Sequence, residues 1–254
     1  MSHVLVVNGA AGRMGRLVAR ELRRTGFTDL AGCDPGAGGS LVLDDMPLVE
    51  DLVRGIEPGG VVVDFSHASA TPALCRAAAA RQARLVVGTT GQSVEELRML
   101  EAAAGRVPVV LARNFSLGIN RLAQVLPKLR VLTSEGFDVE CVEAHHRQKR
   151  DAPSGTAQLL LEALFGSDPP KPVHGRFGSE ALREAGEVGV HSLRLGQLPG
   201  EHTLLLASEH EVLEIRHRAL DRSAFVSGVA PAVRFVQSHP AGLYSMLDVI
   251  ADAP

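Results

Sequence analysis

HVLVVNGAAGRMGRLVARELRRTG, residues 3–26, joins an apolar run, a glycine cluster and an amphipathic charged segment. This order predicts a β-strand, a tight turn and an α-helix that ends at Gly26. Glycines at 9, 12 and 15 form a G-x-x-G-x-x-G pattern, which allows a tight turn and a close approach to the backbone. Free amides at the start of the helix can then bind a pyrophosphate. The same residues could instead form a structural turn that binds no ligand.

The first half of the chain repeats this alternation of strand and helix. Further strands are expected at 28–34, 59–66, 84–91 and 107–116, and helices at 71–83 and 93–105. Several of these strands are continuous apolar runs, which are typical of a parallel sheet covered on both faces. The first half therefore predicts an α/β fold with a doubly wound, Rossmann-like parallel sheet.

The pattern changes after residue 117. Helices are expected at 117–132 and 154–166, strands at 137–146, 188–196, 201–210 and 211–219, and helical structure at 225–250. The three late strands follow one another through short polar links, which favours antiparallel pairing among them. This part predicts a second α+β domain with an open mixed sheet.

Composition excludes several classes of protein. The 254 residues are 45% hydrophobic and 22% charged, with a net charge of −3 and only 4% aromatic residues. This balance is unsuited to nucleic-acid binding, and no apolar run is long enough to cross a membrane. The N-terminal apolar core is too short for a signal peptide. Cys33, Cys75 and Cys141 lie far apart, which favours reduced thiols in a cytoplasm, and no cysteine pair has metal-ligand spacing, so no metal site is expected.

Three further segments follow predicted strands and are candidates for cofactor contacts. Asp34 lies 34 − 15 = 19 residues after Gly15, where a dinucleotide fold has an acid that binds the adenosine ribose. GTTG (88–91) and ARNFS (112–116) follow two apolar runs. The carboxyl ends of parallel strands meet at one edge of a sheet, where ligands bind. Each segment could also be ordinary turn or capping chemistry.

VEAHHRQKRDAPSGTA, residues 142–157, places two histidines and several cations just before a predicted helix. Pro153 disfavours helix at the residue before it, so the charged part is expected to be a loop. Ser154 is a good N-cap, which would leave the amides of Gly155 and Thr156 free at the positive end of the helix. This arrangement predicts a pocket for a carboxylate, although a solvated loop is the alternative.

Side chains in the same segment can move protons. His146 and Lys149 add hydrogen-bond donors to the predicted pocket. His145 and Lys149 can also give up protons, which suits a carbon centre that receives a hydride.

These segments together resemble one known family. EAHHRQKRDAPSGTA closely resembles the signature of the 4-hydroxy-tetrahydrodipicolinate reductase family, also called dihydrodipicolinate reductase, of lysine and diaminopimelate biosynthesis. GAAGRMG, VVGTTG, ARNFSLGIN and LEIRHRALDRSAFVSG follow the order of that family's other motifs. The resemblance covers essentially the whole chain.

The resemblance implies a domain plan and a reaction. Residues 1–116, completed by 228–254, would form the dinucleotide-binding domain, and 117–227 would bind substrate and assemble a homotetramer. The expected reaction is reduction of a small cyclic dicarboxylate, 4-hydroxy-tetrahydrodipicolinate, by NADH or NADPH in the cytoplasm. A hydride would reach ring C4 while the 4-hydroxyl leaves as water.

The resemblance also implies a role for individual residues. His145 and Lys149 look like the catalytic acid/base and proton donor. The residues that look like substrate contacts are His146, Gly155 and Thr156. Those that look like cofactor contacts are Gly9, Ala10, Ala11, Gly12, Arg13, Met14, Asp34, Gly88, Thr89, Thr90, Ala112, Arg113, Asn114 and Phe115.

A few positions depart from the family's common pattern. Gln148 stands where some members have a further histidine, and Arg113 stands where a small residue is common. Pro35 stands where some members have an arginine, which bears on the choice of cofactor. Since Asp34 would repel a 2′-phosphate and Pro35 offers no cation, NADH is expected to be preferred, while Arg13 could limit that preference.

Two other functions stay open on the sequence alone. Another nicotinamide-dependent enzyme, such as an amino-acid dehydrogenase, is compatible with the glycine loop but leaves the segment APSGT unexplained. A non-catalytic dinucleotide-binding sensor is the second, and the presence of both His145 and Lys149 argues against it.

Overall fold

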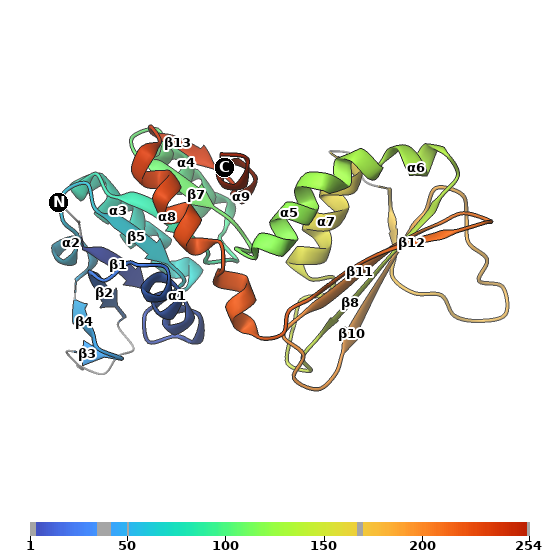
Figure 1. Ribbon diagram of the computed structural model, residues 1–254, viewed down its shortest axis with the longest axis horizontal. Coiled ribbons are helices and arrows are strands. Elements are labelled where there is room, and N and C mark those ends of the chain that lie inside the picture. Colours follow the sequence, from blue (N-terminus) through green and yellow to red (C-terminus); the bar gives the residue numbers. More distant parts are fainter. Residues whose placement is uncertain (1–3, 35–41, 50, 167–169, 253–254) are drawn as a thin grey trace. The chain divides into compact units, whose positions relative to one another are not determined.

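The computed structural model describes residues 4–34, 42–49, 51–166 and 170–252. The chain divides into two compact units, Met1–Leu117 with Arg222–Pro254, and Gly118–Asp221 (Figure 1). Each unit has its own hydrophobic core.

The first unit is built on a largely parallel sheet. Among the described residues its strands are β1 (Leu5–Asn8), β2 (Leu30–Cys33), β3 (Val42–Leu43), β4 (Met46–Val49), β5 (Val61–Asp64), β6 (Arg84–Val87), β7 (Pro108–Leu111) and β13 (Gly242–Tyr244). They lie in the order β13-β7-β6-β5-β1-β2-β4-β3, and only the β3–β4 pair is antiparallel. The strand order reverses at β1, between β2 and β5, so this is the point at which a doubly wound fold binds its ligand.

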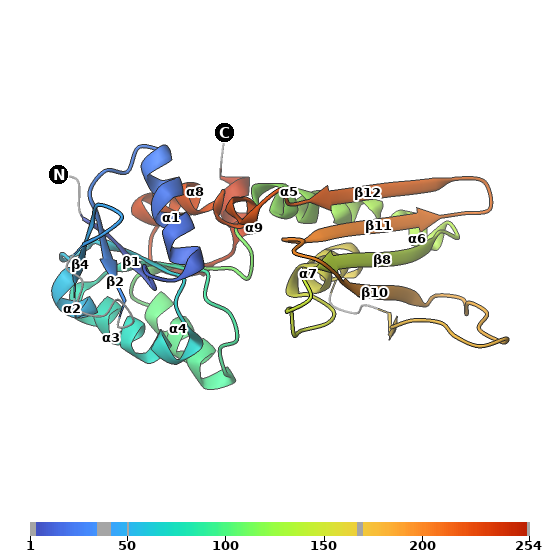
Figure 2. The same ribbon diagram turned by 90° about the horizontal axis from the view of Figure 1, so that it is seen from below.

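Helices cover both faces of this sheet (Figure 2). One face packs on α1 (Arg13–Arg24), α8 (Val229–Ser238) and α9 (Met246–Ala251), and the other on α2 (Leu52–Gly55), α3 (Thr71–Arg81) and α4 (Val94–Ala104). Side chains alternate between the two cores: Val7 belongs to the first, and its neighbour Val6 to the second. Because both faces are buried, the strands are apolar throughout. The doubly wound prediction is confirmed.

The end of the chain is less helical than expected. The segment expected to be helical at 225–250 contains η4 (Arg222–Val226), α8, the strand β13 and α9. Pro240 precedes β13, which pairs in parallel with β7 and extends the first sheet. The short elements β3, β4 and α2 were also not predicted, because runs of two to four residues give too little periodicity.

The second unit is a mixed sheet with helices on one face. Its elements are α5 (Leu117–Val125), η3 (Leu126–Leu129), α6 (Val131–Ser134), β8 (Asp138–His145), α7 (Gly155–Phe165), β9 (Pro172–Val173), β10 (Val188–Arg194), β11 (Glu201–Ala207) and β12 (Val212–Arg218). The expected helix at 117–132 is divided at Pro127, which lies in η3 and cannot donate the backbone hydrogen bond of an α-helix.

The order of this sheet corrects one expectation. The strands lie in the order β12-β11-β8-β10-β9, so β10 and β11 are not neighbours. Strand β8 lies between them, parallel to β10 and antiparallel to β11. The chain between β8 and β10 contains α7 and is long enough for a parallel crossover. The link 195–200, which joins β10 to β11, passes the end of β8.

Side chains of β8 alternate between the two faces of the sheet. Val139, Cys141, Glu143 and His145 are buried on the face that packs on α5 and α7, and the residues between them are partly exposed. Glu143 is a charged residue with no exposed surface on this buried face. A fully buried charge must be paired, and its partners define the candidate site of the second unit.

Candidate active site

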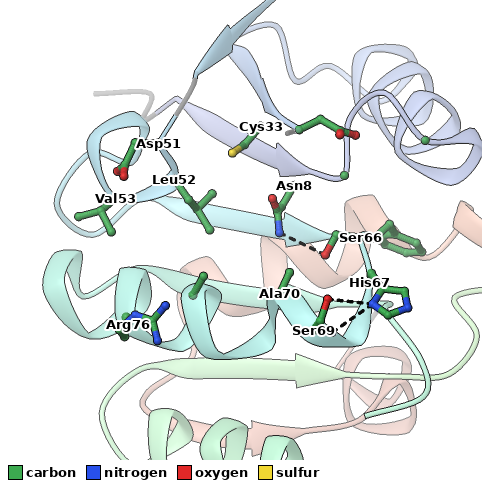
Figure 3. A pocket seen from close by; sticks show the side chains of 15 residues that line it. Asn8, Cys33, Asp51, Leu52, Val53, Ser66, His67, Ser69, Ala70 and Arg76 are labelled. Atoms are coloured by element: carbon green, nitrogen blue, oxygen red, sulfur yellow. Dashed lines mark hydrogen bonds between the residues drawn. The ribbon is translucent and has the colours of Figure 1, made fainter. Parts of the chain in front are cut away.

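A cavity of about 600 Å³ lies at the carboxyl edge of the first sheet (Figure 3). Its wall combines the loops that follow β1, β2 and β5, the strands that flank the reversal of strand order. Three of the predicted cofactor residues line it: Gly9, Gly12 and Asp34. The volume is in the range of small-molecule sites.

The glycines of the loop have different tasks. A Cβ on Gly9 would lie 2.6 Å from the Phe65 carbonyl oxygen, and one on Gly15 would lie 2.1 Å from the Gly9 carbonyl oxygen. These two glycines are therefore required by the protein's own backbone. Gly12 is the N-cap of α1 and lines the cavity, and it has no side chain to cap the first-turn amides. Uncapped amides at a helix start are suited to a phosphate.

Asp34 is anchored to the glycine loop. Its Oδ2 accepts a hydrogen bond of 2.8 Å from the Ala11 amide, which fixes the carboxylate at the wall of the cavity. A carboxylate at the end of the second strand is the group that a dinucleotide fold uses on the ribose. Pro35, the neighbour that bears on cofactor choice, lies outside the described residues.

The two later loops reach the same edge of the sheet, although their residues do not line the cavity. The Thr89 hydroxyl donates to Asp64 at 2.6 Å and accepts from the Ser66 amide at 2.9 Å. The Phe115 ring packs at 5.4 Å from that of Phe65, whose ring leaves no room for a side chain at position 88.

The other predicted cofactor residues vary in exposure. Ala10, Asn114 and Phe115 are buried, Ala11, Met14, Gly88 and Ala112 are partly exposed, and Arg13, Thr90 and Arg113 are exposed. The cavity wall also includes residues that were not predicted, namely Asn8, Cys33, Asp51, Ser66, His67 and Arg76. The only signal for Ser66 and His67 was that they follow an apolar run.

The second unit has a candidate site of its own, built around His145 at the end of β8. The ring is 6% exposed, and its Nδ1 makes a short hydrogen bond to Glu143. Burial alone would raise the pKa of the Glu143 carboxyl, but hydrogen bonds from His145, Arg194 and Ser192 lower it to about 2. Glu143 is therefore ionised at neutral pH, and Nε2 is the ring nitrogen of His145 left to exchange a proton.

Glu143 is held by groups on both sides. Arg194 on β10 donates from its two terminal nitrogens at 2.8 and 3.0 Å, one to each carboxylate oxygen. The Ser154 amide also donates to Glu143, at 3.3 Å. On the other side His202 of β11 lies directly opposite Glu143 in the sheet register. Two-nitrogen binding by arginine fixes a carboxylate in orientation as well as in charge.

His202 completes the cluster as a neutral ring. Its Nε2 lies 3.0 Å from the Ser154 hydroxyl, and its ring meets that of His145 edge-on at 5.1 Å between centroids. Burial, with the nearby charge of His145, lowers the pKa of His202 to about 3. Like Glu143 and Arg194, His202 was not predicted, because its place depends on strand register.

Helix α7 begins as the sequence predicts. Ser154 is its N-cap, and its hydroxyl accepts a hydrogen bond of 3.2 Å from the Ala157 amide. A Cβ placed on Gly155 would meet nothing within 4 Å, so open space lies beside the first residue of the helix. Gly155 and Thr156 are both partly exposed. This helix start is suited to a carboxylate.

Lys149 lies in the turn between β8 and α7. Its ammonium forms an ion pair of 2.9 Å with Asp151, and its amide donates to the His146 carbonyl oxygen at 3.1 Å. Burial would raise the pKa of Asp151, but the hydrogen bond from Lys149 and the charge of the ammonium lower it. The turn that carries His146 and Lys149 thus connects the strand end at His145 to the start of α7.

Glu143, His145 and His202 could in principle bind a cation, since each offers a ligand atom and these atoms lie within 4.8 Å of one another. Both oxygens of Glu143 and Nδ1 of His145 are already hydrogen-bonded, and Arg194 adds a positive charge. The chemistry of the group therefore favours a hydrogen-bond network over a metal centre.

Among the described residues, no helix is long and apolar enough to cross a membrane.

Comparison with known proteins gives matches over both units. The profile of the dihydrodipicolinate reductase N-terminus matches residues 3–115, and that of its C-terminus matches 118–250. A 4-hydroxy-tetrahydrodipicolinate reductase of Caldanaerobacter subterraneus subsp. tengcongensis is 38% identical over 249 residues, and one of Anaeromyxobacter sp. is 39% identical over 259 residues. In each case the match covers 97% of both chains.

A solved structure gives the same result. The dipicolinate-bound dihydrodipicolinate reductase from Paenisporosarcina sp. is 25% identical, with a TM-score of 0.73 over 96% of this chain and 98% of that one. An amine dehydrogenase from Mycobacterium smegmatis has a TM-score of 0.58 at 14% identity, which is a likeness of fold alone.

Proposed function

The chain belongs to the dihydrodipicolinate reductase family, and from this premise we propose that it reduces 4-hydroxy-tetrahydrodipicolinate to tetrahydrodipicolinate with a nicotinamide cofactor. It is accordingly an oxidoreductase of lysine and diaminopimelate biosynthesis. The observation that carries the detailed proposal is the pairing of buried His145 with Glu143, which also accepts from the Ser154 amide at the open start of α7.

The reaction requires a hydride, a proton and a leaving hydroxyl. A bound reduced nicotinamide supplies the hydride. Its arrival at ring C4 displaces the 4-hydroxyl as water, so each turnover takes up one proton. We assign the handling of that proton to Lys149 and His145, whose ring is oriented by Glu143.

The substrate carboxylate is assigned to the start of α7. Gly155 leaves space there, and the helix dipole and the first-turn backbone favour an anion. His146, Thr156 and Lys149 are the side chains we expect to add contacts. Lys149 would then exchange its ion pair with Asp151 for a role at the substrate.

The cofactor is assigned to the cavity of the first unit. Its uncapped helix start, the glycine loop and Asp34 fit the pyrophosphate and the adenosine ribose. The remaining expected contacts are Ala10, Ala11, Arg13, Met14, Gly88, Thr89, Thr90, Ala112, Arg113, Asn114 and Phe115. We propose that NADH is preferred, because the Asp34 carboxylate repels a 2′-phosphate.

The two units are assigned separate tasks. We propose that the dinucleotide-binding domain is 1–116 completed by 228–254, and that 117–227 binds substrate and forms a homotetramer. We place the enzyme in the cytoplasm, where the buried free thiols of Cys33, Cys75 and Cys141 would stay reduced.

Loss of reduced-nicotinamide absorbance, with substrate supplied by a dihydrodipicolinate synthase, tests this assignment. His145→Gln and Lys149→Ala should each lower turnover by roughly 10²–10⁴-fold, since each removes a positioned proton donor. Cofactor affinity should be almost unchanged, because both residues lie outside the cofactor cavity. Lys171→Ala, which removes an exposed lysine of the same unit, is the matched control and should keep full turnover.

The same assay separates the competing functions. Oxidation of an amino acid with no reduction of the dicarboxylate would favour an amino-acid dehydrogenase. Tight cofactor binding without turnover on either substrate would favour a sensor. Near-normal turnover in both variants would remove His145 and Lys149 from the mechanism.

A further inference from the structure

Glu143 makes hydrogen bonds to both parts of the proposed substrate site, and His202 contacts the same two parts. Toward the end of β8 Glu143 binds Nδ1 of His145. Toward the helix it accepts from the backbone amide of Ser154, the N-cap of α7. The carboxylate therefore connects the candidate proton donor to the candidate carboxylate pocket.

Strand register explains why Glu143 can make both contacts. Glu143 and His145 are two residues apart on one strand and so point to the same face. Ser192 on β10 and His202 on β11 lie directly beside Glu143 in the two flanking strands. The carboxylate is thus at the centre of a polar row that crosses three strands under the start of α7.

Arg194 closes the arrangement on the remaining side. It donates to both oxygens of Glu143 and also to the Asp151 carbonyl oxygen at 2.6 Å. Asp151 is the residue that pairs with Lys149. Glu143 therefore contacts His145 directly, and Arg194 is connected to Lys149 through Asp151. His145 and Lys149 are the two groups assigned to proton transfer.

We propose that Glu143 is a positioning residue for catalysis, which selects the ring tautomer of His145 that carries hydrogen on Nδ1 and stabilises the imidazolium during turnover. The inference rests on the proposed function only in assigning His145 to proton transfer. Arg194 holds the carboxylate and moderates its charge, and His202, kept neutral by burial, limits ring motion without competing for the proton.

The charges that face His145 set the sign of a pH test. Glu143 is the anion bound to the ring, and Arg194, which binds Glu143 and lies beside His145 in the sheet register, is the cation. The His202 ring lies edge-on to that of His145, and His217 lies one strand further. Glu143→Gln removes the anion, so the imidazolium should lose its proton at a lower pH. Arg194→Met removes a cation from the carboxylate, so the imidazolium should persist to a higher pH.

The profile of kcat/KM against pH therefore distinguishes positioning from plain structural support. In Glu143→Gln the alkaline limb should move to lower pH by about one unit, with turnover down roughly 10–100-fold. In Arg194→Met the same limb should move to higher pH. Should Glu143→Gln fail to fold, Arg194→Met still tests the proposal through the direction of its shift. Shifts of the same sign in both variants, or none, would overturn it.

A measurement without substrate keeps this inference separate from the proposed function. In protein isotope-labelled at the histidine ring nitrogens, the His145 signals, assigned with His145→Gln, should report hydrogen on Nδ1 in the wild type. Glu143→Gln should change that distribution. Glu140→Gln, on the same strand but the opposite face, is the matched control and should leave it unchanged. A wild type that shows this tautomer but reduces no dicarboxylate would contradict the proposed function alone, and an unchanged tautomer in Glu143→Gln would contradict the positioning role alone.

Discussion

The folded environment fixes the charge states of two residues in the second unit. Glu143 stays ionised because His145, Arg194 and Ser192 satisfy its oxygens. His202 stays neutral because burial opposes a charge on its ring. The pKa of each group differs between the folded and the unfolded chain, so both make the free energy of unfolding depend on pH.

Acid should therefore destabilise the protein. In the unfolded chain a histidine gains a proton near its ordinary pKa of 6.5, whereas folded His202 stays neutral until about pH 3. The unfolded state thus binds more protons, and stability falls as the pH drops through this range. Glu143 acts in the same direction at lower pH. Its contribution to stability is present above pH 4.5 and is lost as the pH falls toward about 2.

Urea unfolding of the wild type and of His202→Asn tests this effect. From about pH 7 to about pH 5 the His202 contribution should be about 2 kcal/mol, so the variant should lose less stability than the wild type by that amount. Asparagine can keep a hydrogen bond to Ser154 but does not titrate. His210→Asn, which replaces an exposed histidine, is the control and should follow the wild type. Equal slopes in all three proteins would contradict a neutral His202.

Cofactor preference is the other prediction at the residue scale. Asp34 is held at the cavity wall by the Ala11 amide, so a 2′-phosphate would meet its negative charge. Arg13 is exposed at the start of α1, and a guanidinium there could bind the phosphate. We expect the Asp34 carboxylate to make the enzyme prefer NADH and Arg13 to reduce the size of that preference. The advantage of NADH should be about 1 kcal/mol, or roughly five- to tenfold.

Values of kcat/KM for both cofactors at fixed ionic strength check this expectation. Asp34→Ala should remove the preference, and Arg13→Ala should increase it by weakening NADPH alone. Asp51→Asn removes another carboxylate of the same cavity but can keep its cap on α2, so it should leave the ratio unchanged. A clear NADPH preference in the wild type would mean that Asp34 serves only the turn.

Site residues could be predicted where they lie together in the sequence. His145, Lys149 and Ser154 fall within ten residues, and the N-cap role of Ser154 is confirmed. Glu143 was visible in the same segment, but nothing in the sequence pairs it with Arg194 or His202. Those partners come from strands β10 and β11, and only the register of the sheet places them beside Glu143.

At the scale of single elements, helix α7 has the clearest function. Its N-cap is Ser154, and this residue also binds Glu143 through its amide and His202 through its hydroxyl. The helix start is thus fixed by two buried side chains before any ligand arrives. Preorganised donors of this kind favour tight binding of an anion.

A flat aromatic dicarboxylate should therefore inhibit competitively against the substrate, and Gly155→Val should weaken it by roughly 10-fold or more by filling the open space. Nothing lies within 4 Å of a Cβ at Gly155, so valine should be accepted by the folded protein. Gly155→Ala adds a single methyl group and serves as the control, with a smaller effect. Inhibition constants and nucleotide affinity would be measured for all three proteins. Unchanged inhibition in a folded Gly155→Val protein would place the carboxylate elsewhere.

Elements could be predicted as far as local pattern determines them. Long apolar or amphipathic runs gave β5, α3 and α4 close to their observed bounds. Short strands such as β13 show no periodicity. They form where a neighbouring strand has a free edge, and β13 pairs with the edge of β7 that would otherwise be unpaired. The pairing of β10 with β8 instead of β11 depends on which strands share a core, which spacing does not encode.

At the scale of the whole molecule, the second unit leaves one face of its sheet without helices. This open face carries Val142, Leu205 and Val212 among charged residues such as Glu201 and Arg216. Val212 is 63% exposed in the single chain. A sheet face of this kind, with apolar side chains surrounded by ion pairs, is typical of a surface covered by another subunit.

We therefore expect the protein to be a homotetramer in solution that assembles through the open face. Light scattering at micromolar concentration should give four chains per particle for the wild type. Leu205→Lys replaces an apolar side chain of this face with a longer one whose charge must be desolvated even though Glu140 and Glu214 lie opposite, so it should shift the particle toward smaller species. Val94→Lys changes an exposed apolar residue of α4 in the other unit and should leave the mass unchanged. Because the substitution leaves the core facing α5 and α7 intact, circular dichroism should report a folded chain in both variants. A stable monomer in the wild type, or a tetramer that persists in Leu205→Lys, would show that the open face is not the surface through which the chains assemble.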